Sequence, residues 1–159
     1  MPQTGNATCS AEEIDAIVSR HFDREGPLLP ILHDVQATWG HIPDAAVPLL
    51  ARALNLSRAD VWGVVTFYHD LRTEPAGKHV LKICRAEACQ AMGCEELVER
   101  AEQRLGVTCG QTSANGRVTL EAVYCLGLCA TAPSAMLDGK VVGRLDEARL
   151  EALIKGAGA

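Results

Sequence analysis

The sequence predicts a mixed α/β protein: an N-terminal helical bundle segment over residues 1–76, followed by a small domain of strands and helices over 77–159. Apolar residues in the first part recur at spacings of three and four, which is typical of amphipathic helices. The second part mixes short alternating segments with one longer helical pattern, which is typical of a small sheet covered by helices. A Glu-Pro-Ala-Gly sequence at 74–77 is a turn-like break and the predicted boundary.

The first helix is predicted to begin after Ser10, because Ser10 and Glu13 have the spacing of a capping box, and to run to about residue 21. Pro27 is suited to the start of a second helix, and Gly40 to a left-handed turn at its end. One face of this second helix is apolar: Leu28, Leu29, Ile31, Leu32 and Val35.

Two further helices are predicted before the break. Pro-Asp at 43–44 restarts the chain, and Ser57 with Asp60 forms another capping box. Helices this short are marginal alone in water, so their apolar stripes must pack on each other or on a partner protein. The stripe residues are Val47, Leu49, Leu50 and Leu54 in the third helix and Val61, Trp62, Val64 and Val65 in the fourth.

The second part begins with an alternating strand at 79–83 and continues with an amphipathic helix at 95–105, ended by Gly106. The Asn-Gly dipeptide at 115–116 is a strong hairpin-turn signal, and a strand over 118–124 follows it.

The end of the chain predicts a hairpin over 135–142 with an Asp-Gly turn, and then a last helix over 146–154 capped by Asp146. We expect residues 156–159 to fray. A strand, a helix, a strand, a hairpin and a last helix form a small sheet with helices packed on it, in the style of thioredoxin.

Composition narrows the range of functions. A net charge of −5 argues against a nucleic-acid partner, since phosphate binding needs a basic face. The chain contains no apolar stretch of about 18 residues, which argues against membrane insertion. Residues 1–7 lack the features of a secretory signal, so we expect a reducing, cytoplasmic location. Seven cysteines in such a chain are better interpreted as metal ligands or free thiols than as disulfides.

Four cysteines form two close pairs, Cys84 with Cys89 and Cys125 with Cys129. Each pair follows a predicted strand, where rigid scaffolds commonly hold sites. Gly127 lies inside the second pair, where a chain that wraps a metal needs a positive φ or a close approach of backbone to sulfur. The sequence therefore predicts a thiolate metal centre.

Three kinds of centre compete on spacing alone. In a [2Fe–2S] cluster, each pair binds one iron, although the second pair differs from the plant-type ferredoxin pattern. A four-cysteine structural zinc site in a protein-interaction module is the second interpretation. Thiol–disulfide chemistry is the least favoured, because it needs a C-x-x-C pair and the sequence has none.

The remaining candidates are weaker. Cys94 repeats the four-residue gap and is an alternative ligand, but it precedes a helix and fits a buried free thiol better. Cys9 and Cys109 lie outside the pattern. The five histidines are dispersed, and the chain has no nucleotide-binding motif and no paired-carboxylate or nucleophile–base motif. We therefore expect no catalytic site on this chain alone.

Three segments of the second part and three of the first resemble the family of the 24 kDa subunit of respiratory NADH dehydrogenase. The resemblance implies a helical N-terminal segment and a thioredoxin-like domain with one [2Fe–2S] cluster, bound by Cys84, Cys89, Cys125 and Cys129. The matching segments are K-I-C-R-A-E-A-C (82–89), A-N-G-R-V-T-L (114–120), Y-C-L-G-L-C-A-T-A-P (124–133), L-L-P-I-L-H (28–33), G-H-I-P-D-A-A-V-P (40–48) and V-V-T-F-Y (64–68).

Within this family, the chain is most similar to the gamma subunits of soluble, molybdenum-dependent, NAD-reducing formate dehydrogenases. That similarity depends on C-R-A-E-A-C-Q (84–90) and A-R-A-L-N-L-S-R-A (51–59). It implies a partner subunit with FMN, the NAD site and a [4Fe–4S] cluster, and a large subunit with the molybdenum cofactor that oxidises formate. The equivalent subunits of respiratory NADH dehydrogenase and of NAD-reducing hydrogenase remain alternatives.

Overall fold

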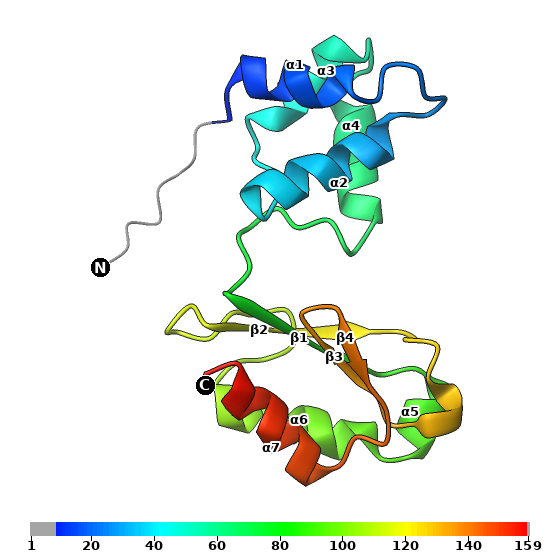
Figure 1. Cartoon of the computed structure of the whole chain (residues 1–159), viewed down its shortest axis with the longest axis vertical. Coiled ribbons are helices and arrows are strands. Elements are labelled where there is room, and N and C mark those ends of the chain that lie inside the picture. The colour runs from blue at the N-terminus through cyan, green and yellow to red at the C-terminus, as the bar shows by residue number, and fades with distance from the viewer. Residues whose placement is uncertain (1–8, 159) are drawn as a thin grey trace. The chain divides into compact units, whose positions relative to one another are not determined.

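The computed structural model describes residues 9–158 of the chain. The chain divides between Pro75 and Ala76 into two compact units, a helical unit and a sheet unit, and each is described by itself (Figure 1). The predicted properties of residues 1–7 lie outside the described residues. No helix among residues 9–158 is long and apolar enough to cross a bilayer.

The described part of the helical unit, residues 9–75, contains four helices, as predicted. Both capping boxes are present, with the Ser10 hydroxyl accepting from the Glu13 amide and the Ser57 hydroxyl from the Asp60 amide. Gly40 ends the second helix with a φ of 76°. The helices are α1 (Ala11–Ser19), α2 (Leu28–Trp39), α3 (Ala46–Ala53) and α4 (Arg58–Phe67).

The apolar stripes of these helices serve two purposes. One set is buried and forms the core of the helical unit: Ile14, Ile17, Ile31, Leu32, Val35, Leu50, Val61 and Val65. A second set is partly exposed and lines an apolar pocket of about 360 Å³ together with Gly26 and Pro27: Leu28, Leu29, Leu54, Leu56, Val64 and Tyr68. The predicted stripe residues divide between these two sets: Ile31, Leu32, Val35, Leu50, Val61 and Val65 are buried in the core, and Leu28, Leu29, Leu54 and Val64 line the pocket.

A buried histidine links α1 to α2. His21 Nε2–H donates to Asp34 Oδ2 over 2.9 Å, and Arg20 Nη2 lies 3.3 Å from the same oxygen. The hydrogen bond from His21, aided by the charge of Arg20, lowers the pKa of Asp34. Because the folded pKa lies below the unfolded one, the Asp34 carboxylate stabilises the fold above pH about 4 and loses that effect as the pH falls.

We therefore expect Asp34→Asn to lower the melting temperature of the full chain at neutral pH, and the deficit to shrink toward about pH 3. Thermal unfolding followed by circular dichroism over this range measures both. Asp15→Asn, which removes a carboxylate elsewhere on α1, controls for the change in net charge. A deficit that stays constant with pH would contradict the assigned role of Asp34.

The sheet unit contains a four-stranded mixed sheet in the order β2-β1-β3-β4. Strand β1 (His79–Cys84) lies between a parallel partner, β2 (Val118–Val123), and an antiparallel one, β3 (Ala135–Leu137). Strand β4 (Lys140–Val142) completes the predicted hairpin with β3. Two helices, α6 (Cys94–Leu105) and α7 (Glu147–Gly156), lie side by side on one face of the sheet (Figure 1). This is the thioredoxin-like arrangement that the order of elements predicts.

The structure differs from the sequence prediction in three places. A short helix, α5 (Glu87–Ala91), occupies the loop after β1. The turn at 115–116 does not join two full strands: on the free edge of β2, Thr112 forms an isolated bridge with Thr119, and backbone hydrogen bonds link Leu120 to Gly110 and Gln111. The expectation that residues 156–159 fray is wrong for those described, since α7 runs through Gly156 and Ala157 is 2% exposed in the core.

Candidate metal centre

Parallel pairing of β1 and β2 brings the two cysteine pairs together. The strands are in register to their ends, where Cys84 pairs with Val123, so the chain leaves both strands at one edge of the sheet. Cys89 lies on α5 beyond β1, and Cys129 begins a 3₁₀ turn (Cys129–Thr131) beyond β2. Figure 1 shows α5 and the gold 3₁₀ turn at the same end of the sheet unit.

The first pair is buried. Cys84 and Cys89 are each 2% exposed, in an apolar cluster that includes Cys94. Behind them lies Ser134, whose carbonyl accepts the Cys84 amide over 2.9 Å and whose hydroxyl is 3.6 Å from Cys89 Sγ. The sequence prediction missed Ser134, because nothing in its spacing places it beside a cysteine that is 45 residues away.

The second pair is exposed, and its backbone conformation is unusual. Cys125 has a φ of 114°, and Gly127 has a φ of 75°. The Gly127 amide donates to Cys125 Sγ over 3.3 Å. Gly127 therefore meets both conditions that the sequence prediction set for it, a positive φ and a backbone N–H directed at sulfur.

Sulfur spacing tests whether these residues fit a cluster. Cys125 Sγ and Cys129 Sγ are 3.7 Å apart. Two thiolates on one tetrahedral metal, each with a metal–sulfur distance of about 2.3 Å, are separated by about 3.8 Å. The 3.7 Å spacing therefore lets this pair share one tetrahedral metal, as one iron of a [2Fe–2S] cluster requires.

Burial, hydrogen bonds and neighbouring charge shift the pKa values of three of the four paired thiols. Burial disfavours the Cys84 thiolate, but hydrogen bonds from the Ala86 amide and the Cys89 side chain, with others, lower the pKa of Cys84. Burial raises the pKa of Cys89. The hydrogen bond with Cys125 and its negative charge raise the pKa of Cys129. In the first pair the Cys84 thiolate is therefore favoured over that of Cys89, and metal binding requires both thiols to be deprotonated.

The other cysteines have different surroundings. Cys94 is fully buried, and burial together with the Glu95 charge raises the pKa of its thiol to about 11. Cys9 packs on the core of the helical unit. Cys109 packs on the core of the sheet unit, and its amide donates to Glu102.

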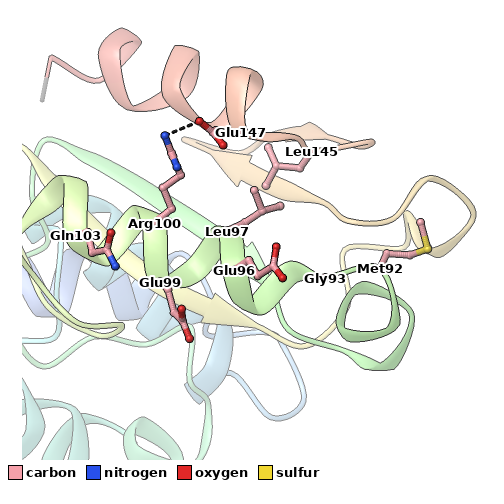
Figure 2. Close-up of a pocket in the computed structure, with 9 residues that line it drawn as sticks. All are labelled: Met92, Gly93, Glu96, Leu97, Glu99, Arg100, Gln103, Leu145 and Glu147. Carbon is pink, nitrogen blue, oxygen red and sulfur yellow. Dashed lines mark ion pairs between the residues drawn. The ribbon is translucent and has the colours of Figure 1, made fainter.

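A separate pocket of about 420 Å³ lies between α6 and α7 (Figure 2). Arg100 forms an ion pair with Glu147 across this pocket, and its Nε lies 3.8 Å from a Glu151 oxygen. Arg104 reaches the same Glu151 carboxylate over 3.0 Å. These ion pairs link the two helices beside the pocket.

We expect Gly127→Ala to destabilise the cysteine loop by about 1–2 kcal/mol, because an L side chain is strained at positive φ. Apart from its two chain neighbours, no described protein atom lies within 4 Å of the added Cβ, so the substitution adds no clash with another residue. The temperature at which the visible absorption of the cluster bleaches measures this destabilisation. Gly156→Ala is the control, since Gly156 is helical with equally open space, and alanine there stabilises by about 0.5–1 kcal/mol. Equal bleaching temperatures in wild type and Gly127→Ala would contradict the strain argument.

Known proteins resemble this chain along most of its length. The model of the thioredoxin-like [2Fe–2S] ferredoxin family matches residues 14–157. An NADH-quinone oxidoreductase subunit of Rhizobium meliloti (strain 1021) is 37% identical over 91% of this chain and 86% of its own length. The NADP-reducing hydrogenase subunit HndA of Solidesulfovibrio fructosivorans is 29% identical, over 82% of this chain and 77% of that protein.

A solved structure, the NAD⁺-reducing [NiFe]-hydrogenase in its air-oxidised state, superposes with a TM-score of 0.71 and 26% identity. The match covers 82% of this chain but 22% of the hydrogenase chain, so this protein corresponds to about a fifth of that one. The family match, the sheet topology and the paired cysteines lead to the same conclusion: this chain belongs to the thioredoxin-like [2Fe–2S] ferredoxin family, and its cofactor is a [2Fe–2S] cluster.

Proposed function

We propose that Cys84 and Cys89 bind one iron of the cluster and that Cys125 and Cys129 bind the other. The observation that carries this proposal is the convergence of the two pairs at one edge of the sheet, through the parallel register of β1 and β2. The sulfur spacing in the second pair fits one tetrahedral iron. In this proposal, the sheet domain of residues 77–159 binds the cluster and residues 1–76 form a separate helical domain.

The chain is an electron-transfer subunit of complexes related to NADH dehydrogenase. A bound [2Fe–2S] cluster stores and releases one electron at a time. The resemblance to the NADH dehydrogenase family implies a flavoprotein partner that carries FMN and the NAD site, and this chain has no nucleotide-binding motif of its own. Its relatives include subunits of NADH-quinone oxidoreductase and of a hydrogenase, which supports this role.

More specifically, the complex is a soluble, cytoplasmic, NAD-dependent formate dehydrogenase, with this chain as its gamma subunit. Formate would be oxidised at the molybdenum cofactor of a large subunit, and its electrons would reach NAD through the flavoprotein. The runs C-R-A-E-A-C-Q at 84–90 and A-R-A-L-N-L-S-R-A at 51–59 support this assignment. The 37% identity to a subunit of NADH-quinone oxidoreductase favours the alternative, the equivalent subunit of a quinone-reducing complex.

Co-purification separates these candidates. We expect an affinity tag on this chain, expressed in its native host, to retain formate-dependent reduction of NAD⁺, together with FMN and molybdenum. The tagged Cys125→Ala chain, prepared in the same way, is the matched control and should retain less of this activity. If the tag instead retains quinone-dependent NADH oxidation or hydrogen-dependent NAD⁺ reduction, with no formate activity, the formate assignment is wrong and an alternative complex replaces it.

A further inference from the structure

Ser134 is a buried hydroxyl directly behind the first cysteine pair. The residue is 1% exposed and lies in the short segment between the 3₁₀ turn and β3. Its Oγ is 3.6 Å from Cys89 Sγ. Its carbonyl accepts the Cys84 amide, which anchors the segment to the end of β1. A polar side chain in this position needs a partner, and the partner that the structure provides is sulfur.

The direction of this hydrogen bond follows from the chemistry of the site. A cysteine bound to iron is a thiolate and has no proton to give. Between Ser134 Oγ and Cys89 Sγ, the hydroxyl must therefore donate once a cluster is bound. A donor to the charged form of a group stabilises that form.

The burial of Cys84 and Cys89 makes the Ser134 hydroxyl an important hydrogen-bond donor. Cys125 and Cys129 are exposed, so water can solvate charge at their end of the centre. Cys84 and Cys89 are buried, where negative charge is disfavoured unless polar groups compensate. One-electron reduction adds a negative charge to the centre, and hydrogen bonds to sulfur are among the factors that set its reduction potential.

We propose that the Ser134 hydroxyl donates to Cys89 Sγ and thereby raises the reduction potential of the cluster. Ser134 is a tuning residue that acts through Cys89 and is not itself a ligand. This inference rests on the proposed ligand set. Because the hydrogen bond strengthens as sulfur becomes more negative, it favours the reduced state, and its removal must lower the potential.

The test uses the full chain with its cluster. We expect Ser134→Ala to reduce the equilibrium constant for one-electron reduction about tenfold, which is a fall of about 59 mV for a one-electron couple. Potentiometric titration followed by EPR measures the shift, after iron and sulfide analysis has established equal cluster content. Ser134→Thr keeps a hydroxyl and should return the potential toward that of the wild type.

A second buried serine of the sheet unit provides the matched control. Ser113 donates to Asn115 Oδ1 and accepts the Val118 amide, so Ser113→Ala removes a buried hydroxyl that is bonded to other partners. It should leave the potential unchanged. If Ser134→Ala fails to assemble the cluster, Ser134→Thr and Ser134→Val, which match in volume, give the same comparison of a hydroxyl with none.

The outcomes are distinct. Equal potentials in wild type and Ser134→Ala with intact clusters, or in the Thr and Val variants, would overturn the role of Ser134 and leave the ligand proposal standing. An equal shift in Ser113→Ala would also overturn it, because the effect would then be general to the fold. Variants of the paired cysteines that keep the iron content of the wild type would overturn the ligand set instead.

Discussion

Cys125→Ala is expected to abolish the [2Fe–2S] cluster, with iron and acid-labile sulfide falling at least tenfold. The remaining three thiols cannot complete four-coordination of both irons, since each iron needs two cysteine ligands besides the bridging sulfides. Cys125 is the best position for this test because it is exposed in a loop, so its removal creates no core cavity. Visible absorption and the EPR signal of the reduced protein measure the loss.

Matched controls come from the cysteines outside the two pairs. Cys109→Ala and Cys9→Ala change partly buried thiols that pack on the two separate cores, and both should keep full cluster content and an unchanged EPR signal. A Cys125→Ala variant with wild-type iron, sulfide and EPR would remove Cys125 from the ligand set. Loss of the cluster in the controls as well would show that any thiol removal disrupts assembly.

Leu81→Ala is expected to cost about 2–5 kcal/mol of stability, the range for a leucine truncated in a well-packed core. Leu81 is fully buried in the middle of β1, where it pairs in register with Leu120 of β2 and Leu137 of β3. The same strand ends at Cys84, so the truncation weakens the platform that holds the cysteine pairs. Urea unfolding followed by circular dichroism measures the change in stability.

Val141→Ala on β4 is the control, because Val141 is 51% exposed at the edge of the sheet and should change stability by less than about 0.5 kcal/mol. Cluster bleaching should begin at lower urea in Leu81→Ala than in the control. If the two variants unfold at the same urea concentration, that result would contradict the packing assigned to Leu81 at the centre of the sheet.

Local signals predict the helices well. The capping boxes at Ser10 and Ser57 and the left-handed turn at Gly40 lie where the sequence predicts them, because each depends on residues within a few positions of one another. Helix α5 has no such signal, since five residues carry too little periodicity to recognise. Ala157 lies in the predicted frayed tail, and its burial depends on core packing that its neighbours in sequence do not reveal.

Spacing and local pattern are properties of the linear chain, and they were enough to predict the family, the helical first half and the four paired cysteines. The way in which those pairs meet required the folded chain, since the parallel register of β1 and β2 joins segments far apart in sequence. Folding also buries the first pair, leaves the second exposed and brings the Ser134 hydroxyl within 3.6 Å of Cys89 Sγ. Burial and long-range hydrogen bonds exist only in the folded chain, so the electrostatic environment of the centre had to come from the structure.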